Sequence, residues 1–340
     1  MPDKMPTNAE AGARPSRADF GAIIEAQRRA LKLHCYRMLG SLHEAEDAVQ
    51  ESMLRAWRGF DAFEARASTK NWLFKIATNT SLNIIEARTR RNRVSPERLG
   101  GPAIERPTGK PDVEAPWVEP FPDGEIESIA DPEPGPDARY ELREAVRLAF
   151  VAAIQELPPR QRAALLLADV MGWSAIEVAA VLDTSVASVN SALQRARATL
   201  AAPQREAGEA ASVNEQDRAL LQRYVTAWES RDLEKFVALL KDDATYAMPP
   251  WREWYSGRAS IGDFFRSVWS AYRGFRLVPT GANLQPAFGL YALRADGRWS
   301  AHSLQLLTLE QGEIATFTAY MQPLANRLFS TFQLPLVLEA

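Results

Sequence analysis

Residues 173–200 read WSAIEVAAVLDTSVASVNSALQRARATL, and this stretch indicates how the middle of the chain folds. Ala179 and Ala180 are small enough for two helices to approach closely, and the polar residues 183–185 turn the chain between them. Leu193 is on the inner side of the second helix, at helical spacing from other apolar residues. This layout predicts a helix-turn-helix. A plain helical hairpin with a solvated outer face has the same spacing and remains the alternative.

The second of these helices is expected to have a polar outer face. Short polar side chains and an arginine at such positions reach phosphates and base edges in a major groove. The residues expected to contact DNA are Ser185, Ser188, Asn190, Ser191, Gln194 and Arg195.

Helical periodicity also runs through residues 18–93, where no stretch alternates like a strand. Ser41 is a plausible N-cap, and Glu44 completes a capping box. In residues 43–63 (HEAEDAVQESMLRAWRGFDAF) the acidic side chains fall within two turns, which predicts an anionic surface suited to a basic partner. The apolar face of that helix is expected to consist of Val49, Met53, Leu54 and Trp57.

Residues 67–93 (ASTKNWLFKIATNTSLNIIEARTRRNR) carry amides and cations that crowd toward the end of the predicted helix. Such a surface suits a phosphate backbone and exposed bases, although a solvated run of charges has the same composition. The residues expected to contact nucleic acid are Lys70, Lys75, Asn79, Asn83, Arg88 and Arg91.

The stretch from Val94 to Pro136 has a different composition, with 10 prolines among 43 residues, 10 acidic residues and 3 basic ones. Because aliphatic residues are few, we expect a flexible linker.

The sequence as a whole predicts six segments. They are a disordered tail over 1–17, a helical domain over 18–93, this acidic linker over 94–136, a helix-turn-helix domain over 137–202, a short linker over 203–213 and an α+β domain over 214–330.

The last segment is expected to be α+β because two helical patterns, 216–240 and 260–272, precede alternating stretches rich in β-branched and aromatic residues. Ala295-Asp296-Gly297 and Glu310-Gln311-Gly312 are expected hairpin turns.

Charge and cysteine content restrict the remaining possibilities. The net charge of −3 does not exclude nucleic-acid binding, because it is a sum over segments of different charge. Residues 16–93, for example, hold 14 basic and 9 acidic side chains. A single cysteine excludes an intrachain disulfide and favours the cytoplasm. The sequence also predicts no membrane span, no cofactor and no metal site, because His34, His43, His302 and Cys35 are not at ligand spacings.

Taken together, these motifs resemble the extracytoplasmic-function group of the sigma-70 family. DAVQESMLRAWRGF (47–60) is similar to region 2.2, residues 68–91 to regions 2.3 and 2.4, and residues 156–200 to region 4. The resemblance implies that residues 63–69 and the helix through Asn79 open and read the minus-ten promoter element, while helix 186–199 reads the minus-thirty-five element.

The same resemblance implies promoter DNA and the RNA polymerase core, through its β′ coiled coil and β flap, as partners. The residues it assigns to polymerase docking are Glu46, Asp47, Gln50, Glu51 and Trp57.

Residues 214–328 resemble the SnoaL-like fold, a cone of sheet and helices that hosts enzymes and non-catalytic binders alike. Asp243, Glu253, Asp263 and His302 are candidate catalytic groups, but none forms a compelling set, so no enzyme activity is predicted. A small molecule is a possible ligand. The residues expected to line its pocket are Trp228, Tyr246, Trp254, Trp269 and His302.

Three functions are compatible with these features. The favoured one is a sigma factor whose activity the SnoaL-like domain modulates; the others are a ligand-responsive helix-turn-helix repressor and a SnoaL-like isomerase or hydrolase tethered to DNA-binding domains. The acidic helix face over 44–57 discriminates against the repressor, because a repressor has no need of a surface for polymerase.

Overall fold

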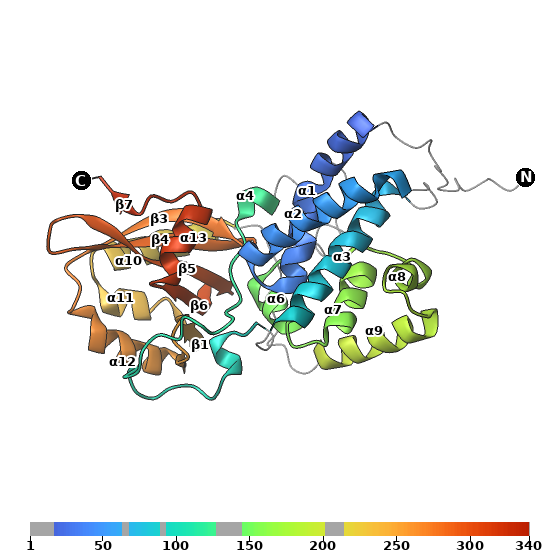
Figure 1. The fold of residues 1–340 in the computed structure, drawn as a ribbon. Helices are drawn as coiled ribbons and strands as arrows, with labels where there is room; N and C mark the ends of the chain where they lie inside the picture. Colours follow the sequence, from blue (N-terminus) through green and yellow to red (C-terminus); the bar gives the residue numbers. More distant parts are fainter. Residues whose placement is uncertain (1–16, 63–67, 89–92, 127–144, 201–213, 340) are drawn as a thin grey trace, which may run out of the picture. The chain divides into compact units, whose positions relative to one another are not determined.

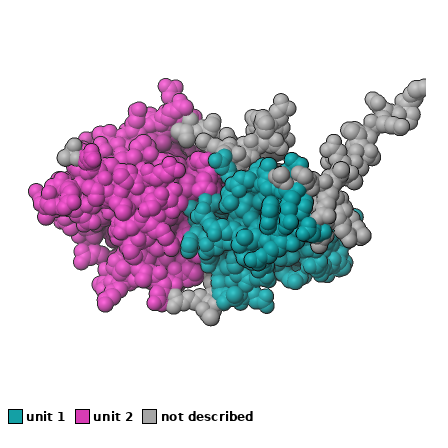
Figure 2. Space-filling view, turned by 45° about the horizontal axis from the view of Figure 1, so that its top comes forward, with its two compact units in different colours: residues 1–90, 154–201 teal, residues 91–153, 202–340 magenta. Residues whose placement is uncertain are grey.

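A computed structural model describes residues 17–62, 68–88, 93–126, 145–200 and 214–339 (Figure 1). The chain divides into two compact units (Figure 2). Unit 1 comprises residues 1–90 and 154–201, and unit 2 comprises residues 91–153 and 202–340. The chain therefore leaves unit 1, contributes a segment to unit 2, and returns to complete unit 1.

Unit 1 is helical throughout its described part, as the periodicity predicts. Three long helices pack against one another, and a second group of shorter helices follows the return of the chain. The first group is α1 (Arg17–Leu39), α2 (Leu42–Gly59), the short 3-10 helix η1 (Phe60–Ala62) and α3 (Thr69–Ala87). The second is α7 (Pro159–Leu165), the π-helical turn η3 (Leu166–Val170), α8 (Ala175–Val181) and α9 (Val186–Leu200).

Polar caps begin several of these helices. Ser41 accepts a hydrogen bond from the backbone N–H of Glu44, as expected, and the Glu44 carboxylate pairs with Arg88, which follows α3. Ser174 and Glu177 form a full capping box at the start of α8. No described helix is by itself long and apolar enough to cross a membrane; α8 and α9 reach that threshold only as a pair bent by 101°.

A buried arginine joins the two helical groups of unit 1. Arg162 of α7 is 0% exposed and donates to the carbonyl oxygen of Met38 at the end of α1. It also donates to both oxygens of Gln155, at 2.6 and 2.7 Å, and Gln155 in turn donates to the carbonyl oxygen of Arg37. Burial lowers the pKa of Arg162 to about 9, so the guanidinium is still charged at pH 7. Each backbone acceptor in this network would lose its partner without it.

Unit 2 contains a seven-stranded sheet in the order β2-β1-β6-β5-β4-β3, with the short β7 paired to the free end of β5. Neighbouring strands are antiparallel except β1 and β6, which are parallel. The strands are β1 (Leu240–Ala247), β2 (Trp254–Ser256), β3 (Phe275–Ala282), β4 (Gln285–Leu293), β5 (Trp299–Glu310), β6 (Glu313–Met321) and β7 (Val337–Leu338).

Helices give unit 2 two apolar cores. The larger core combines the sheet with α10 (Glu215–Glu229), α11 (Leu233–Val237) and α12 (Arg258–Trp269), and the smaller one contains α13 (Leu324–Thr331). The expected turns are confirmed, with Gly297 and Gly312 both at positive φ. The β3–β4 turn, in contrast, uses Asn283 and Leu284, both at φ 56, and gives no glycine signal in the sequence.

Residues 93–126 pack along unit 2, and we call them the strap. Trp117 is 2% exposed and Phe121 is 0% exposed. The strap also forms two backbone bridges, Val94 with Trp117 and Pro122 with Ala282 of β3. Its short helical turns are η2 (Pro96–Arg98) and α4 (Asp123–Ile126).

The expectation of a flexible linker over 94–136 is therefore wrong for residues 94–126, and residues 127–144 lie outside the described part. The reason is local, because Trp117, Val118 and Phe121 form a short apolar cluster in this stretch and all three are buried, whereas Ile104 and Val113 are exposed. Hydrogen bonds to the rest of unit 2 satisfy the backbone around them, such as that from the Tyr320 hydroxyl to the Val118 carbonyl oxygen.

The helix-turn-helix part of unit 1 begins later than the predicted residue 137. Unit 1 resumes at Ile154, so the boundary between the units falls within α6 (Leu148–Ile154).

Replacing Arg162 with methionine should lower the free energy of unfolding by about 2–4 kcal/mol, because buried carbonyl groups lose a charged donor. Urea unfolding followed by circular dichroism measures this. Arg55→Met is the matched control, since Arg55 makes an exposed pair with Glu51 and its loss should cost less than about 0.5 kcal/mol. Equal effects of the two variants would contradict the role of Arg162.

Phe121→Ala should detach the strap, since truncating a fully buried phenylalanine costs about 3–5 kcal/mol. Limited proteolysis should then cleave within residues 93–126 at least tenfold faster than in the parent. Ile104, which is 95% exposed in the same strap, provides the control variant Ile104→Ala. Unchanged cleavage of Phe121→Ala would mean that the strap is held by other contacts.

Candidate functional sites

The helix-turn-helix of unit 1 forms as predicted. Val178, Val181, Val189 and Leu193 are buried between α8 and α9, and Asp183 turns the chain at φ 47. All six residues expected to contact DNA from this motif are exposed. The hydroxyl of Ser185 accepts from the backbone N–H of Ser188 at 3.1 Å and so caps the first turn of α9.

The two arginines of α9 differ in their surroundings. Arg197 donates to both carboxylate oxygens of Asp169, at 2.6 and 2.9 Å, which raises its pKa. Arg195 is exposed beside Ser191 and Asn190 on the outer face. Arg195 is therefore the arginine of this helix that is available to a ligand.

The residues predicted on α3 divide into three groups. Lys70 and Asn83 are exposed and Asn79 is half-buried, so all three keep polar atoms at the surface. Lys75 donates to Asp183 at 3.0 Å and to the Ala180 carbonyl oxygen at 2.8 Å. Arg91 and residues 63–67 lie outside the described residues.

Arg88 is a correction to the sequence-based prediction. Its guanidinium donates to the Leu39 carbonyl oxygen at 3.1 Å and pairs with Glu44, and only 12% of its side chain is exposed. This arginine ties α3 to α1 and α2. Its guanidinium stabilises the packing of unit 1 and is too buried to contact DNA.

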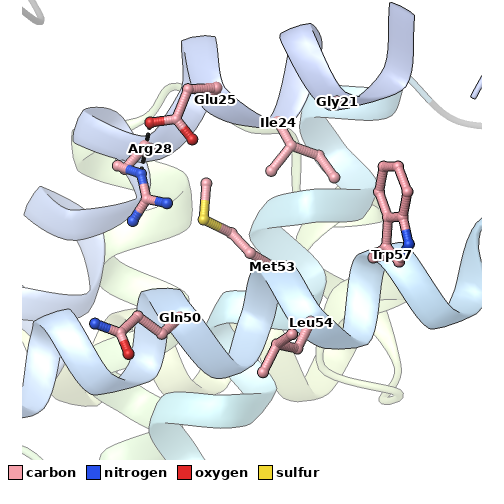
Figure 3. A pocket seen from close by; sticks show the side chains of 8 residues that line it. All are labelled: Gly21, Ile24, Glu25, Arg28, Gln50, Met53, Leu54 and Trp57. Carbon is pink, nitrogen blue, oxygen red and sulfur yellow. Dashed lines mark hydrogen bonds and ion pairs between the residues drawn. The ribbon is translucent and has the colours of Figure 1, made fainter. Parts of the chain in front are cut away.

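An apolar groove of about 410 Å³ lies between α1 and α2 (Figure 3). Ile24 and Met53 lie on facing sides, while Leu54 is 52% exposed and Trp57 is 42% exposed. Leu54 and Trp57 therefore do not belong to the buried face that periodicity predicts for α2. The Trp57 ring is stacked at 6.3 Å on the buried ring of Phe20, which fixes its position.

The charged residues that line this groove are Glu25 and Arg28, which pair with each other at 2.7 Å, and further acids lie on α2 outside the lining. Glu46 and Asp47 are exposed, with only long ion pairs of 3.7 Å to Lys32 and 3.8 Å to His43. Glu51 pairs with Arg55 at 2.7 Å on the same helix. Leu54 and Trp57 are large exposed apolar side chains on a helix that also carries exposed acids, a combination typical of interaction surfaces.

Unit 2 holds a cavity of about 330 Å³ in its larger core. Trp228, Tyr246, Trp269 and His302 line it, as predicted. Trp254 does not, because its indole N–H is turned to the strap and donates to the Gly100 carbonyl oxygen at 2.9 Å. The strap residues Arg106 and Pro107 also line the cavity, as do Tyr272 and Gln305, and none of these four was predicted.

The polar groups of the cavity are uncharged apart from Arg106. His302 is hydrogen-bonded to the Tyr272 hydroxyl at 2.9 Å, and burial lowers its pKa to about 4, so the imidazole is neutral at pH 7. The Tyr224 hydroxyl donates to Gln305 at 2.8 Å.

The carboxylates considered for catalysis are elsewhere. Asp243 is an exposed neighbour of Lys241, Asp263 pairs with Arg266, and Glu253 is not part of the lining. Among the described residues, no group of three histidine, cysteine or acidic side chains is arranged to bind a metal.

The contact between α3 and the helix-turn-helix should be weak. Replacing Lys75 with Met, Asp183 with Asn, and both together should give a coupling free energy of about 0.2–1 kcal/mol in urea unfolding, since both side chains are partly exposed. The pair Arg197 and Asp169 serves as a reference exposed pair. A coupling free energy above about 2 kcal/mol would instead mean that this ion pair strongly stabilises the contact of α3 with the helix-turn-helix.

Comparisons with known proteins match all three parts of the chain. Residues 23–91 match the model for sigma-70 region 2, residues 147–200 that for sigma-70 region 4, and residues 221–317 that for the SnoaL-like domain. The ECF RNA polymerase sigma factor SigG of Mycobacterium tuberculosis is 41% identical over 325 residues, which cover 94% of this chain and 85% of SigG.

Two further relatives have lower identity. The ECF RNA polymerase sigma factor SigW of Bacillus subtilis is 27% identical over 53% of this chain and 86% of its own length. The crystal structure of the extracytoplasmic function sigma factor SigJ of M. tuberculosis matches with a TM-score of 0.58 and 19% identity, covering 93% of this chain and 99% of SigJ. The latter supports the fold, including the SnoaL-like part.

Proposed function

The chain belongs to the extracytoplasmic-function sigma factors of RNA polymerase, which direct promoter recognition in transcription initiation, and we propose that the groove between α1 and α2 is its polymerase-docking surface. The observation that carries this proposal is the exposure of Leu54 and Trp57 on an otherwise well-packed helix, whose first half carries the exposed acids Glu46 and Asp47. A basic helical partner such as the β′ coiled coil would bury the two apolar side chains and face the acids.

The promoter-contacting surfaces follow from the same division of unit 1. We assign the minus-thirty-five element to the outer face of α9, with Asn190, Gln194 and Arg195 reading base edges and Ser185, Ser188 and Ser191 contacting the backbone. The minus-ten side falls to α3, through Lys70, Asn79 and Asn83. Lys75 joins them only when its contact with Asp183 opens.

Unit 2 is assigned a regulatory, non-catalytic role. Its cavity lacks a carboxylate among the described residues that line it, and its neutral His302 is paired with Tyr272, so a general acid–base couple is not assembled. The strap is part of unit 2 and lies between the two halves of unit 1 in the chain, so a change in unit 2 can be transmitted along the backbone.

Leu54→Asp should reduce binding to core RNA polymerase by at least tenfold, since a charge replaces an apolar contact in the docking surface. Fluorescence anisotropy of the labelled full chain with core enzyme measures this, and transcription in vitro should fall in parallel. Leu336→Asp is the control, because Leu336 has a similar exposure of 46% in unit 2. Unaltered binding of Leu54→Asp would remove the docking assignment.

Arg195→Ala should weaken initiation at promoters selected from a random library by about 5–150-fold, the range expected for losing a contact of 1–3 kcal/mol to a base pair. The base preference at one position of the minus-thirty-five element should also become weaker among the selected promoters. Arg197→Ala, on the same helix but paired with Asp169, should change initiation much less. If the two variants behave alike, α9 does not read DNA through Arg195.

A further inference from the structure

We propose that the cavity of unit 2 binds a small aromatic carboxylic acid, with its rings among the aromatic walls and its carboxylate against Arg106 of the strap, so that the strap closes over the ligand. The binding site does not depend on the regulatory role proposed above; only its effect on transcription does.

The shape and walls of the cavity favour flat apolar molecules. Its volume of about 330 Å³ is at the lower end for small-molecule sites and suits a compound of one to three rings. Trp228, Trp269, Phe265 and Phe317 present their rings to it. The ring centroids of Trp228 and Trp269 are 4.8 Å apart with planes tilted by 48°, and the rings of Trp228 and Phe265 are perpendicular. Because the rings of the walls differ in orientation, they offer both faces and edges to a planar guest.

The charges around the cavity favour an anion. Aromatic walls alone would attract cations. Here, however, the charged residue of the described lining is Arg106, and the charge of Arg294 also acts on His302 and Tyr272. Burial is the larger cause for both groups: it lowers the pKa of His302 and raises that of Tyr272, and Arg294 adds to the first shift and opposes the second. No carboxylate in the described lining opposes these two arginines, so a cationic guest is disfavoured.

Arg106 is held in place by the backbone around it. The Tyr255 hydroxyl donates to the carbonyl oxygen of Glu105 at 2.9 Å, and the N–H of Ala103 donates to the Trp254 carbonyl oxygen at 2.7 Å. On the other side of Arg106, Asp112 accepts both Arg252 hydrogen bonds, at 2.6 and 2.9 Å, and this lowers the Asp112 pKa. Arg106 is exposed and lines the cavity, and hydrogen bonds hold the strap on both sides of it.

A second polar anchor lies on the sheet side. His302 on β5 and Tyr272, just after α12, form a neutral hydrogen-bonded pair in the lining. Such a pair can donate to, and accept from, a hydroxyl or carbonyl group of a ligand. An aromatic acid with a second polar substituent would therefore contact the strap and the sheet at once.

The test uses three probes that share one ring system and differ in charge: 2-naphthoate, 2-naphthamide and 2-naphthylmethylammonium. Titration of the full chain, followed by calorimetry and by tryptophan fluorescence, should give binding in the order anion, amide, cation, with at least tenfold between the first and the last. Equal affinities for all three, or no binding of naphthoate at millimolar concentration, would overturn the proposal.

Variants then assign the carboxylate contact. Arg106→Gln should weaken naphthoate at least tenfold and leave naphthamide unchanged, while Arg106→Lys should recover part of the loss. Lys110→Gln, an exposed cation of the same strap outside the lining, is the matched control. An Arg106→Gln chain that binds naphthoate as well as the parent does would remove Arg106 from the site.

Closure by the strap has its own measurement. Naphthoate at saturating concentration should slow hydrogen exchange at the N–H groups of Ala103 and Asp112, which bond to Trp254 and Pro250. Binding without such protection would contradict closure.

Transcription with and without naphthoate is measured separately. An effect of naphthoate that Arg106→Gln abolishes supports regulation. Full binding of naphthoate with no effect on transcription overturns the regulatory role while leaving the binding site in place.

Discussion

The hydrogen bonds between the strap and the C-terminal sheet are the constraint on which the organisation of this sigma factor depends. The Asn283 side chain accepts from the Phe121 N–H and donates to the Val146 carbonyl oxygen, so one buried amide at the β3–β4 turn holds both segments that precede the helix-turn-helix. Because residues 91–153 fold with unit 2, part of the unit that contains the SnoaL-like domain lies in the chain between the parts that match sigma-70 regions 2 and 4, and the rest follows them.

Local patterns were sufficient for most of the fold. Helical spacing, serine caps and the turn at 183–185 predicted unit 1, and alternation with glycine turns predicted β5, β6 and the hairpin between them. The strap was mispredicted because its composition is that of a disordered segment. Three apolar side chains within five residues, Trp117, Val118 and Phe121, were the signal that an average over 43 residues concealed.

The sites were predictable only where exposure follows from helix geometry. All the polar residues assigned to the outer face of α9 are exposed, since their positions depend on one helix alone. Arg88 and Trp254 were misassigned because tertiary partners decide their roles: Glu44 engages the arginine, and Gly100 of the strap accepts from the indole. Arg106 lies far from the cavity walls in sequence, so no periodic pattern could have placed it among them.

The insertion of the strap into unit 2 also has a consequence for synthesis on the ribosome. Residues 93–126 emerge before the strands that they contact, and the chain from residue 126 to the end of β6 takes about 10–40 s to make at 5–20 residues per second. Unit 1 is complete at residue 201, well within that interval. On the nascent chain, all residues of unit 1 are therefore present while Trp117 and Phe121 still lack the sheet that buries them, so these apolar side chains stay exposed until β6 has been made.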